Sequence, residues 1–198
     1  MRPTAIALCL ALTVVAAETR AEPVVPASLQ GEWTTDCLPI GRAGRHGMIT
    51  RLVVDGSGQM SAWSQVFASN ACREPTVQAQ YRSQLLELQE DPEALRITHR
   101  IESILLKTNR DEVTAVYNDP ETAAGCGLTG WQTHIARPVD GRSCSVFDLP
   151  EAGETLLDRV WVDGNGVAFG AYPLKWSVRT EDDLAKVPSA VRFYRTGY

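Results

Sequence analysis

The chain lacks the residue patterns that mark the commonest catalytic, metal and nucleic-acid sites. Its three histidines and its cysteines show no CxxC or HxxxH spacing, so we expect no zinc site. The GxSxG pattern is absent, which excludes the nucleophile elbow of α/β-hydrolases. Lysine and arginine form no stripe, and the formal net charge is -5 at pH 7, so nothing favours nucleic acid as a partner. We therefore expect a protein that is not an enzyme and that needs no metal or cofactor.

Long hydrophobic runs are also absent, except near the N-terminus. There the short basic segment Met1-Arg2 precedes the apolar residues 5–17, a pattern typical of a signal peptide with cleavage after Ala17 or Ala21. That run is shorter than the roughly 20 apolar residues that cross a bilayer. The expected organisation is a signal peptide at 1–21, a Pro-rich lead-in at 22–28 and one domain at 29–198. We expect a periplasmic or secreted protein without a transmembrane segment.

Four cysteines remain after the expected signal peptide: Cys37, Cys72, Cys126 and Cys144. An even number of cysteines in an exported chain indicates two disulfides. Three pairings are compatible with four cysteines. We favour Cys37 with Cys72 and Cys126 with Cys144, because each of these pairs brackets one local unit of structure.

Helical periodicity is scarce, and no βαβ spacing occurs. Polar and apolar residues instead alternate with the period of two that is typical of half-buried strands, and short strands recur about every ten residues. We predict strands at 29–37, 48–54, 59–68, 76–88, 95–107, 112–117, 128–137, 156–162, 167–172 and 191–196. One short helix is expected at 180–186. This rhythm predicts an all-β protein, an antiparallel up-and-down barrel of about eight to ten strands.

Two glycine-rich tetrapeptides separate predicted strands. Asp55-Gly56-Ser57-Gly58 and Asp163-Gly164-Asn165-Gly166 are typical of hairpin turns, because glycine adopts positive φ without penalty. The second also has a fragment of a calcium-loop pattern, but no downstream glutamate completes it. The carboxylates between residues 87 and 93 lie in a polar turn, so we interpret them as a solvated surface.

The first predicted strand carries a more specific pattern. The motif Leu29-x-Gly31-x-Trp33-x-x-x-Cys37, a hairpin and then Asn70-Ala71-Cys72 resembles the lipocalin-like barrels of exported bacterial proteins. It is also similar to the domain of the Wnt antagonist called adenomatosis-polyposis-coli-down-regulated 1. The resemblance covers residues 29–90.

The resemblance implies roles for four residues and for the barrel as a whole. Gly31 would let the first strand bend, and Trp33 would plug one end of the barrel. An arginine of the last strand, Arg192 or Arg195, would pack on the Trp33 indole and donate to nearby carbonyls. The open end of such a barrel would bind a small apolar or amphipathic molecule, or dock a protein.

Candidate ligand contacts follow from the predicted inward faces. The residues Tyr81, His99, Tyr117 and Trp131 share faces with aliphatic side chains, so in a hollow barrel their polar tips would orient a ligand. The alternative is that they are ordinary core residues, with His99 a satisfied interior histidine. We therefore expect an exported binding protein for a small hydrophobic or amphipathic ligand. The other hypotheses are an envelope interaction protein or hydrolase inhibitor acting through the loop 41–47, and an enzyme using His99.

Overall fold

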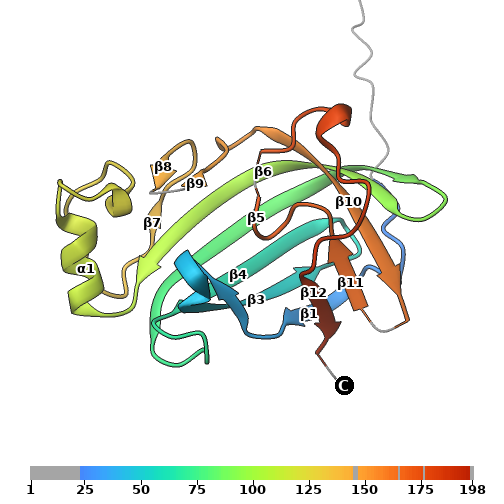
Figure 1. The fold of residues 1–198 in the computed structure, drawn as a ribbon. Helices are drawn as coiled ribbons and strands as arrows, with labels where there is room; N and C mark the ends of the chain where they lie inside the picture. Colours follow the sequence, from blue (N-terminus) through green and yellow to red (C-terminus); the bar gives the residue numbers. More distant parts are fainter. Residues whose placement is uncertain (1–22, 145–146, 165, 176, 197–198) are drawn as a thin grey trace, which may run out of the picture.

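Eight antiparallel strands close on themselves to form a β-barrel in the computed structural model (Figure 1). The structure describes residues 23–144, 147–164, 166–175 and 177–196, so the predicted signal peptide lies outside the described residues. Neighbouring strands follow the order β1-β12-β11-β10-β6-β5-β4-β3, and β3 pairs again with β1. The predicted class, an all-β antiparallel lipocalin-like barrel with one short helix, is confirmed.

The elements have the following bounds: β1 Gly31–Thr35, β2 Leu38–Ile40, β3 His46–Val54, β4 Gln59–Phe67, β5 Pro75–Glu90, β6 Leu95–Thr108, α1 Asp111–Asn118, β7 Arg137–Pro138, β8 Ser143–Cys144, β9 Phe147–Asp148, β10 Thr155–Asp163, β11 Gly166–Phe169 and β12 Arg192–Arg195. Both β1 and β2 pair with β3, so they act as one strand with a break at residues 36–37. Strand β7 pairs with β6, while β8 and β9 form a separate hairpin.

The hairpin between β3 and β4 shows how local sequence sets the register. The carboxylate of Asp55 accepts hydrogen bonds from the backbone N–H groups of Ser57 and Gln59, both at 2.9 Å. Gly58 has a φ of +85°, which other residues rarely adopt. The turn therefore pairs Val54 with Met60, and both side chains enter the barrel.

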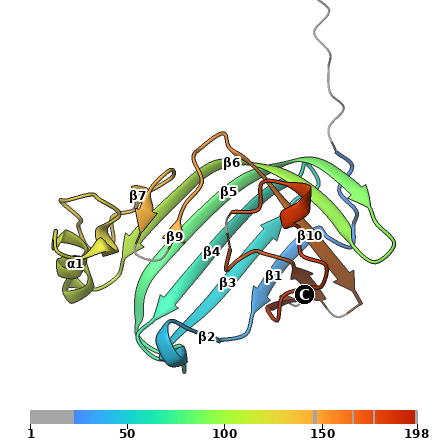
Figure 2. The same cartoon turned by 45° about the horizontal axis from the view of Figure 1, so that its top comes forward.

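The long strands β5 and β6 run past their neighbours. They have 16 and 14 residues, whereas β11 and β12 have four each. Strand β10 pairs with residues 95–100 of β6, and the rest of β6 continues beyond it toward α1 (Figure 1). One end of the barrel is thus walled by β3 to β6 without the short strands opposite, as Figure 2 shows from a second direction.

Two predicted strands are wrong. Residues 112–117 belong to the helix α1, and 128–137 is largely irregular, with strand structure at its last residue alone. A six-residue alternation fits a helix equally well here: Thr114 is buried, and Tyr117, three residues later, packs on Trp131. The acidic pair Asp111 and Glu112 also favours a helix N-terminus. The predicted helix at 180–186 is a single 3-10 turn, Glu181–Asp183.

The four cysteines form the two expected disulfides, Cys37–Cys72 and Cys126–Cys144. The first joins the break between β1 and β2 to the loop between β4 and β5. The second closes the excursion between β6 and β10, defined here as residues 109–154, which contains α1. Within the described residues, no helix has the length and apolar character that crossing a membrane requires.

Candidate functional site

The two ends of the barrel differ. The end that contains β1 and the β3–β4 hairpin is sealed around Trp33. Its indole is 2% exposed, and its Nε1 donates to the Leu29 carbonyl at 3.0 Å. The Arg195 guanidinium lies over the ring, 4.3 Å from its centroid, and donates to the Ser28 carbonyl at 3.3 Å. Of the two arginines considered for this position, Arg195 thus lies on Trp33. Arg192 instead forms an exposed ion pair with Asp163.

Gly31 makes this seal sterically feasible. Its φ is +125°, and a Cβ at this position would lie 2.6 Å from Nη1 of Arg195. Any larger residue would therefore be strained and would also displace the arginine from Trp33. Aliphatic side chains fill the barrel behind the indole, each at most 2% exposed: Leu52, Val54, Met60, Leu85, Ile97 and Ile101.

At the opposite end, inward-facing residues remain partly exposed. On β4 and β5, every second residue faces the barrel interior, as Ala62 and Tyr81 do. Toward this end, the inward-facing residues of the two strands are Ser64, Val66, Val77 and Ala79. The Ser64 hydroxyl shares a hydrogen bond of 2.8 Å with the hydroxyl of Thr50, which is fully buried behind this wall. This wall of mixed apolar and hydroxyl character is called the accessible wall below. It lies where the short strands β11 and β12 do not reach.

A polar pair lies deeper in the barrel. The Tyr81 hydroxyl is 2.6 Å from Nδ1 of His99, and both side chains are buried. Burial lowers the pKa of His99 to about 4, so the imidazole is neutral at pH 7. Burial also raises the pKa of Tyr81 well above its usual value. The pair is therefore a fixed, uncharged dipole inside an apolar interior.

The segment that follows β11 enters the barrel beside this pair. Tyr172 packs its ring against Tyr81, Phe169 and Phe193, with centroid distances of 5.7, 5.3 and 6.0 Å. The buried Asp158 carboxylate holds the segment in place, because it accepts backbone N–H bonds from residues 159, 170, 171 and 172 at 2.8 to 3.3 Å. Desolvation nevertheless raises the pKa of Asp158 to about 6.

Sequence reasoning missed Asp158 and Tyr172. The sequence did carry a signal at Asp158, because this residue lies on the same, buried face of its strand as Leu156 and Val160. An acidic residue at such a position needs hydrogen-bond donors. Nothing in the local sequence indicated that these donors would come from backbone more than ten residues later.

The other two predicted ligand contacts lie outside the barrel. Tyr117 on α1 packs edge-on against Trp131, with ring centroids 5.1 Å apart, and Arg137 covers the Trp131 ring at 5.2 Å. The indole donates to the Gly125 carbonyl at 3.2 Å. The structure thus brings the four predicted residues together as two separate pairs, one in the barrel and one in the excursion.

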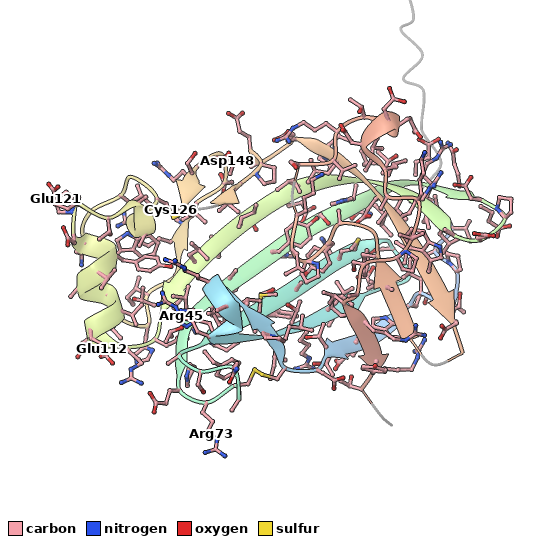
Figure 3. All side chains as sticks on the ribbon, viewed as in Figure 1. Arg45, Arg73, Glu112, Glu121, Cys126 and Asp148 are labelled. Carbon is pink, nitrogen blue, oxygen red and sulfur yellow. A yellow bond between two sulfur atoms is a disulfide. The ribbon has the colours of Figure 1, made fainter. Side chains whose placement is uncertain are left out.

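Charged side chains lie on the loops around the barrel. Figure 3 shows Arg73 pointing away from the loop between β4 and β5, and Glu112 and Glu121 pointing away from α1 and the turn after it. The loop 41–47 contains Arg42 and Arg45, both exposed. No family model matches this chain, and no curated protein matches it. The geometry of the barrel is therefore the basis for assigning a function.

Proposed function

We propose that this protein is an exported, non-enzymatic binding protein that holds a small hydrophobic or amphipathic molecule against the accessible wall. The observation that carries the proposal is the partial exposure of Ser64, Val66, Val77 and Ala79, which face into a closed barrel. Buried inward-facing residues at the other end leave this end as the route of entry.

The composition of the accessible wall supports an amphipathic ligand. Val66, Val77 and Ala79 offer apolar surface, while the partly exposed Ser64 offers a hydroxyl group that can donate or accept. The Tyr172 ring and the Tyr81–His99 pair lie further in, and Tyr81 contacts Tyr172 directly. An apolar wall with a few fixed polar groups is the usual composition of a small-molecule site.

Two disulfides and the signal-like N-terminus support a periplasmic or secreted location. Disulfides persist in oxidising compartments and are rare in the cytosol. The lipocalin-like strand pattern adds support, because Trp33, Gly31 and Arg195 occupy the positions in which that resemblance implies a sealed barrel end.

Titration with cis-parinaric acid, a fluorescent fatty acid, tests the proposal. Ala79→Trp places a large side chain inside the barrel, and we expect it to weaken binding at least tenfold. Gln80→Trp is the matched control, because its side chain points outward from the next position of the same strand, and its affinity should equal that of the wild type. Failure of the wild type to bind, or equal affinity of Ala79→Trp, would contradict the proposal. Circular dichroism checks that both variants fold.

A second candidate function, a protein–protein interaction at the loops, is favoured by the exposed apolar residues of the excursion. Val116 is 48% exposed and Ile135 is 54% exposed, on a part of the chain that projects beyond the barrel (Figure 1). Capture from an envelope extract with the wild type and with a Val116→Glu, Ile135→Glu double variant tests this candidate. One stoichiometric partner that is lost with the double variant would support it.

A further inference from the structure

A crevice of about 370 Å³ lies on the outer side of the barrel, beside the tip of the β5–β6 hairpin. Asp91, Pro92, Glu93 and Ala94 of this tip line it together with Arg159 and Trp161 of β10 and Lys186. Lys186 belongs to the chain between β11 and β12. Three elements that are far apart in sequence therefore build the crevice, and none of its residues lies in the accessible wall.

Two residues of each charge line this crevice, and the two signs come from different elements. The hairpin tip supplies the carboxylates of Asp91 and Glu93. Strand β10 supplies the guanidinium of Arg159, and the later segment supplies the ammonium of Lys186. A simple anion would meet the two carboxylates, and a simple cation would meet the two basic groups. A ligand that carries one charge of each sign avoids both repulsions.

Arg159 has hydrogen-bonding capacity to spare. Its Nη1 donates to the Ala185 carbonyl at 3.3 Å, and its Nη2 lies 3.3 Å from an Asp91 oxygen. Both contacts are long for a charged donor. Its Nε is buried and has no hydrogen-bond acceptor within the described parts of the chain. The Arg159 side chain as a whole is 29% exposed, so its Nη groups, rather than the buried Nε, are available to a ligand oxygen.

Trp161 provides the apolar part of the crevice. It points outward from β10, since its neighbour Val160 is fully buried, and it is partly exposed. With Pro92 it offers a flat apolar surface beside the charged groups. A volume of about 370 Å³ lies within the roughly 300–1,000 Å³ of small-ligand sites.

We propose that this crevice binds a zwitterion, either an amino acid or a short peptide with an apolar or aromatic side chain. The carboxylate accepts from the Nη groups of Arg159, in the planar geometry that a guanidinium offers a carboxylate, and from Lys186. The ammonium group is directed toward Asp91 and Glu93. The apolar side chain packs on Trp161. This site is independent of the proposed function, because it lies on the outer side of the barrel.

Calorimetric titration of the mature protein with the dipeptide glycyl-L-phenylalanine tests the ligand class. The dipeptide should bind, and both N-acetylglycyl-L-phenylalanine and glycyl-L-phenylalanine amide should bind at least tenfold more weakly. Equal binding of the acetylated form would identify a simple anion site and overturn the proposal. Equal binding of the amide, or no binding of the free dipeptide, would also overturn it.

Variants locate the binding. Arg159→Gln and Lys186→Gln should each weaken binding, Arg159→Gln by tenfold or more, and Lys186→Gln leaves the contact between Arg159 and Ala185 intact. Trp161→Ala should weaken binding, whereas Trp161→Phe should retain most of it. Trp63→Ala is the matched control, because Trp63 is also a tryptophan on the outer face but lines a different crevice. Unchanged affinity in both the Arg159 and Lys186 variants would contradict the assignment.

Discussion

The sealed end and the accessible end of the barrel share strands β3 to β6, yet they differ in what fills them. At the sealed end, Trp33 and aliphatic side chains are at most 2% exposed, and Arg195 covers the indole. At the accessible end, inward-facing residues such as Val77 and Ala79 remain partly exposed. The difference arises from strand length, because β11 and β12 are too short to face the far halves of β5 and β6.

The two ends also differ in polarity. The sealed end is almost wholly apolar, whereas the other end has the partly exposed Ser64 hydroxyl, which shares a hydrogen bond with the buried Thr50. Between them lies the Tyr81–His99 pair, and Asp158 anchors the segment that carries Tyr172. The most tightly buried apolar side chains therefore lie at the sealed end, while the polar groups lie nearer the accessible end.

The largest expected effect is at the sealed end. Trp33→Ala removes a buried indole and its contact with Arg195, and we expect a loss of about 3–5 kcal/mol in the free energy of unfolding. Urea denaturation measures this loss. Trp63→Ala is the control, because Trp63 is 36% exposed, and it should cost much less. Equal losses at the two positions would contradict the contrast between a sealed interior and an outer face.

Removal of the Cys37–Cys72 disulfide should loosen the accessible end. The bond closes a loop of 35 residues, and the chain-entropy relation gives about 3–4 kcal/mol of stabilisation. We expect the Cys37→Ser, Cys72→Ser variant to melt several degrees below the wild type. Hydrogen exchange should quicken first in β2 and the start of β5. Faster exchange at β1 and Trp33 instead would show that the two ends are not separately stabilised.

The smallest expected effect is a pair of opposed pH dependences. The folded-state pKa of His99 is lowered to about 4, so its contribution to stability is present above pH 6.5 and is lost as the pH falls through 4. The folded-state pKa of Asp158 is raised to about 6, so its contribution is present below pH 3.8 and is lost as the pH rises through 6. Each slope is at most about 1.4 kcal/mol per pH unit.

Replacing either His99 or Asp158 should leave the pH dependence of the free energy of unfolding that the other residue causes. Relative to the wild type, His99→Gln should become more stable as the pH falls from 6 to 4, and Asp158→Asn should become less stable over the same range. Chemical denaturation at several pH values measures both slopes. Parallel curves for the two variants and the wild type would show that neither group titrates differently in the folded and unfolded states.

Local patterns predicted the parts of the fold that depend on near neighbours in sequence. Alternation identified β5 and β6, and the Asp55-Gly56-Ser57-Gly58 turn set the β3–β4 hairpin. Alternation failed at 112–117, since a run of six residues is too short to distinguish a helix from a strand. Tyr117 and Trp131 were consequently assigned to the barrel interior, whereas the structure places them in the excursion.

The amino-acid sequence alone determined the antiparallel all-β class and the paired cysteines, because period-two alternation, cysteine number and turn glycines act locally, and the lipocalin-like resemblance implied the place of Trp33. Only the tertiary structure decided that Arg195 rather than Arg192 covers Trp33, that Asp158 anchors Tyr172, and which end remains accessible. Those features depend on barrel closure and on strands of unequal length meeting across it. Such contacts join residues more than ten and up to about 160 positions apart, which no local pattern records.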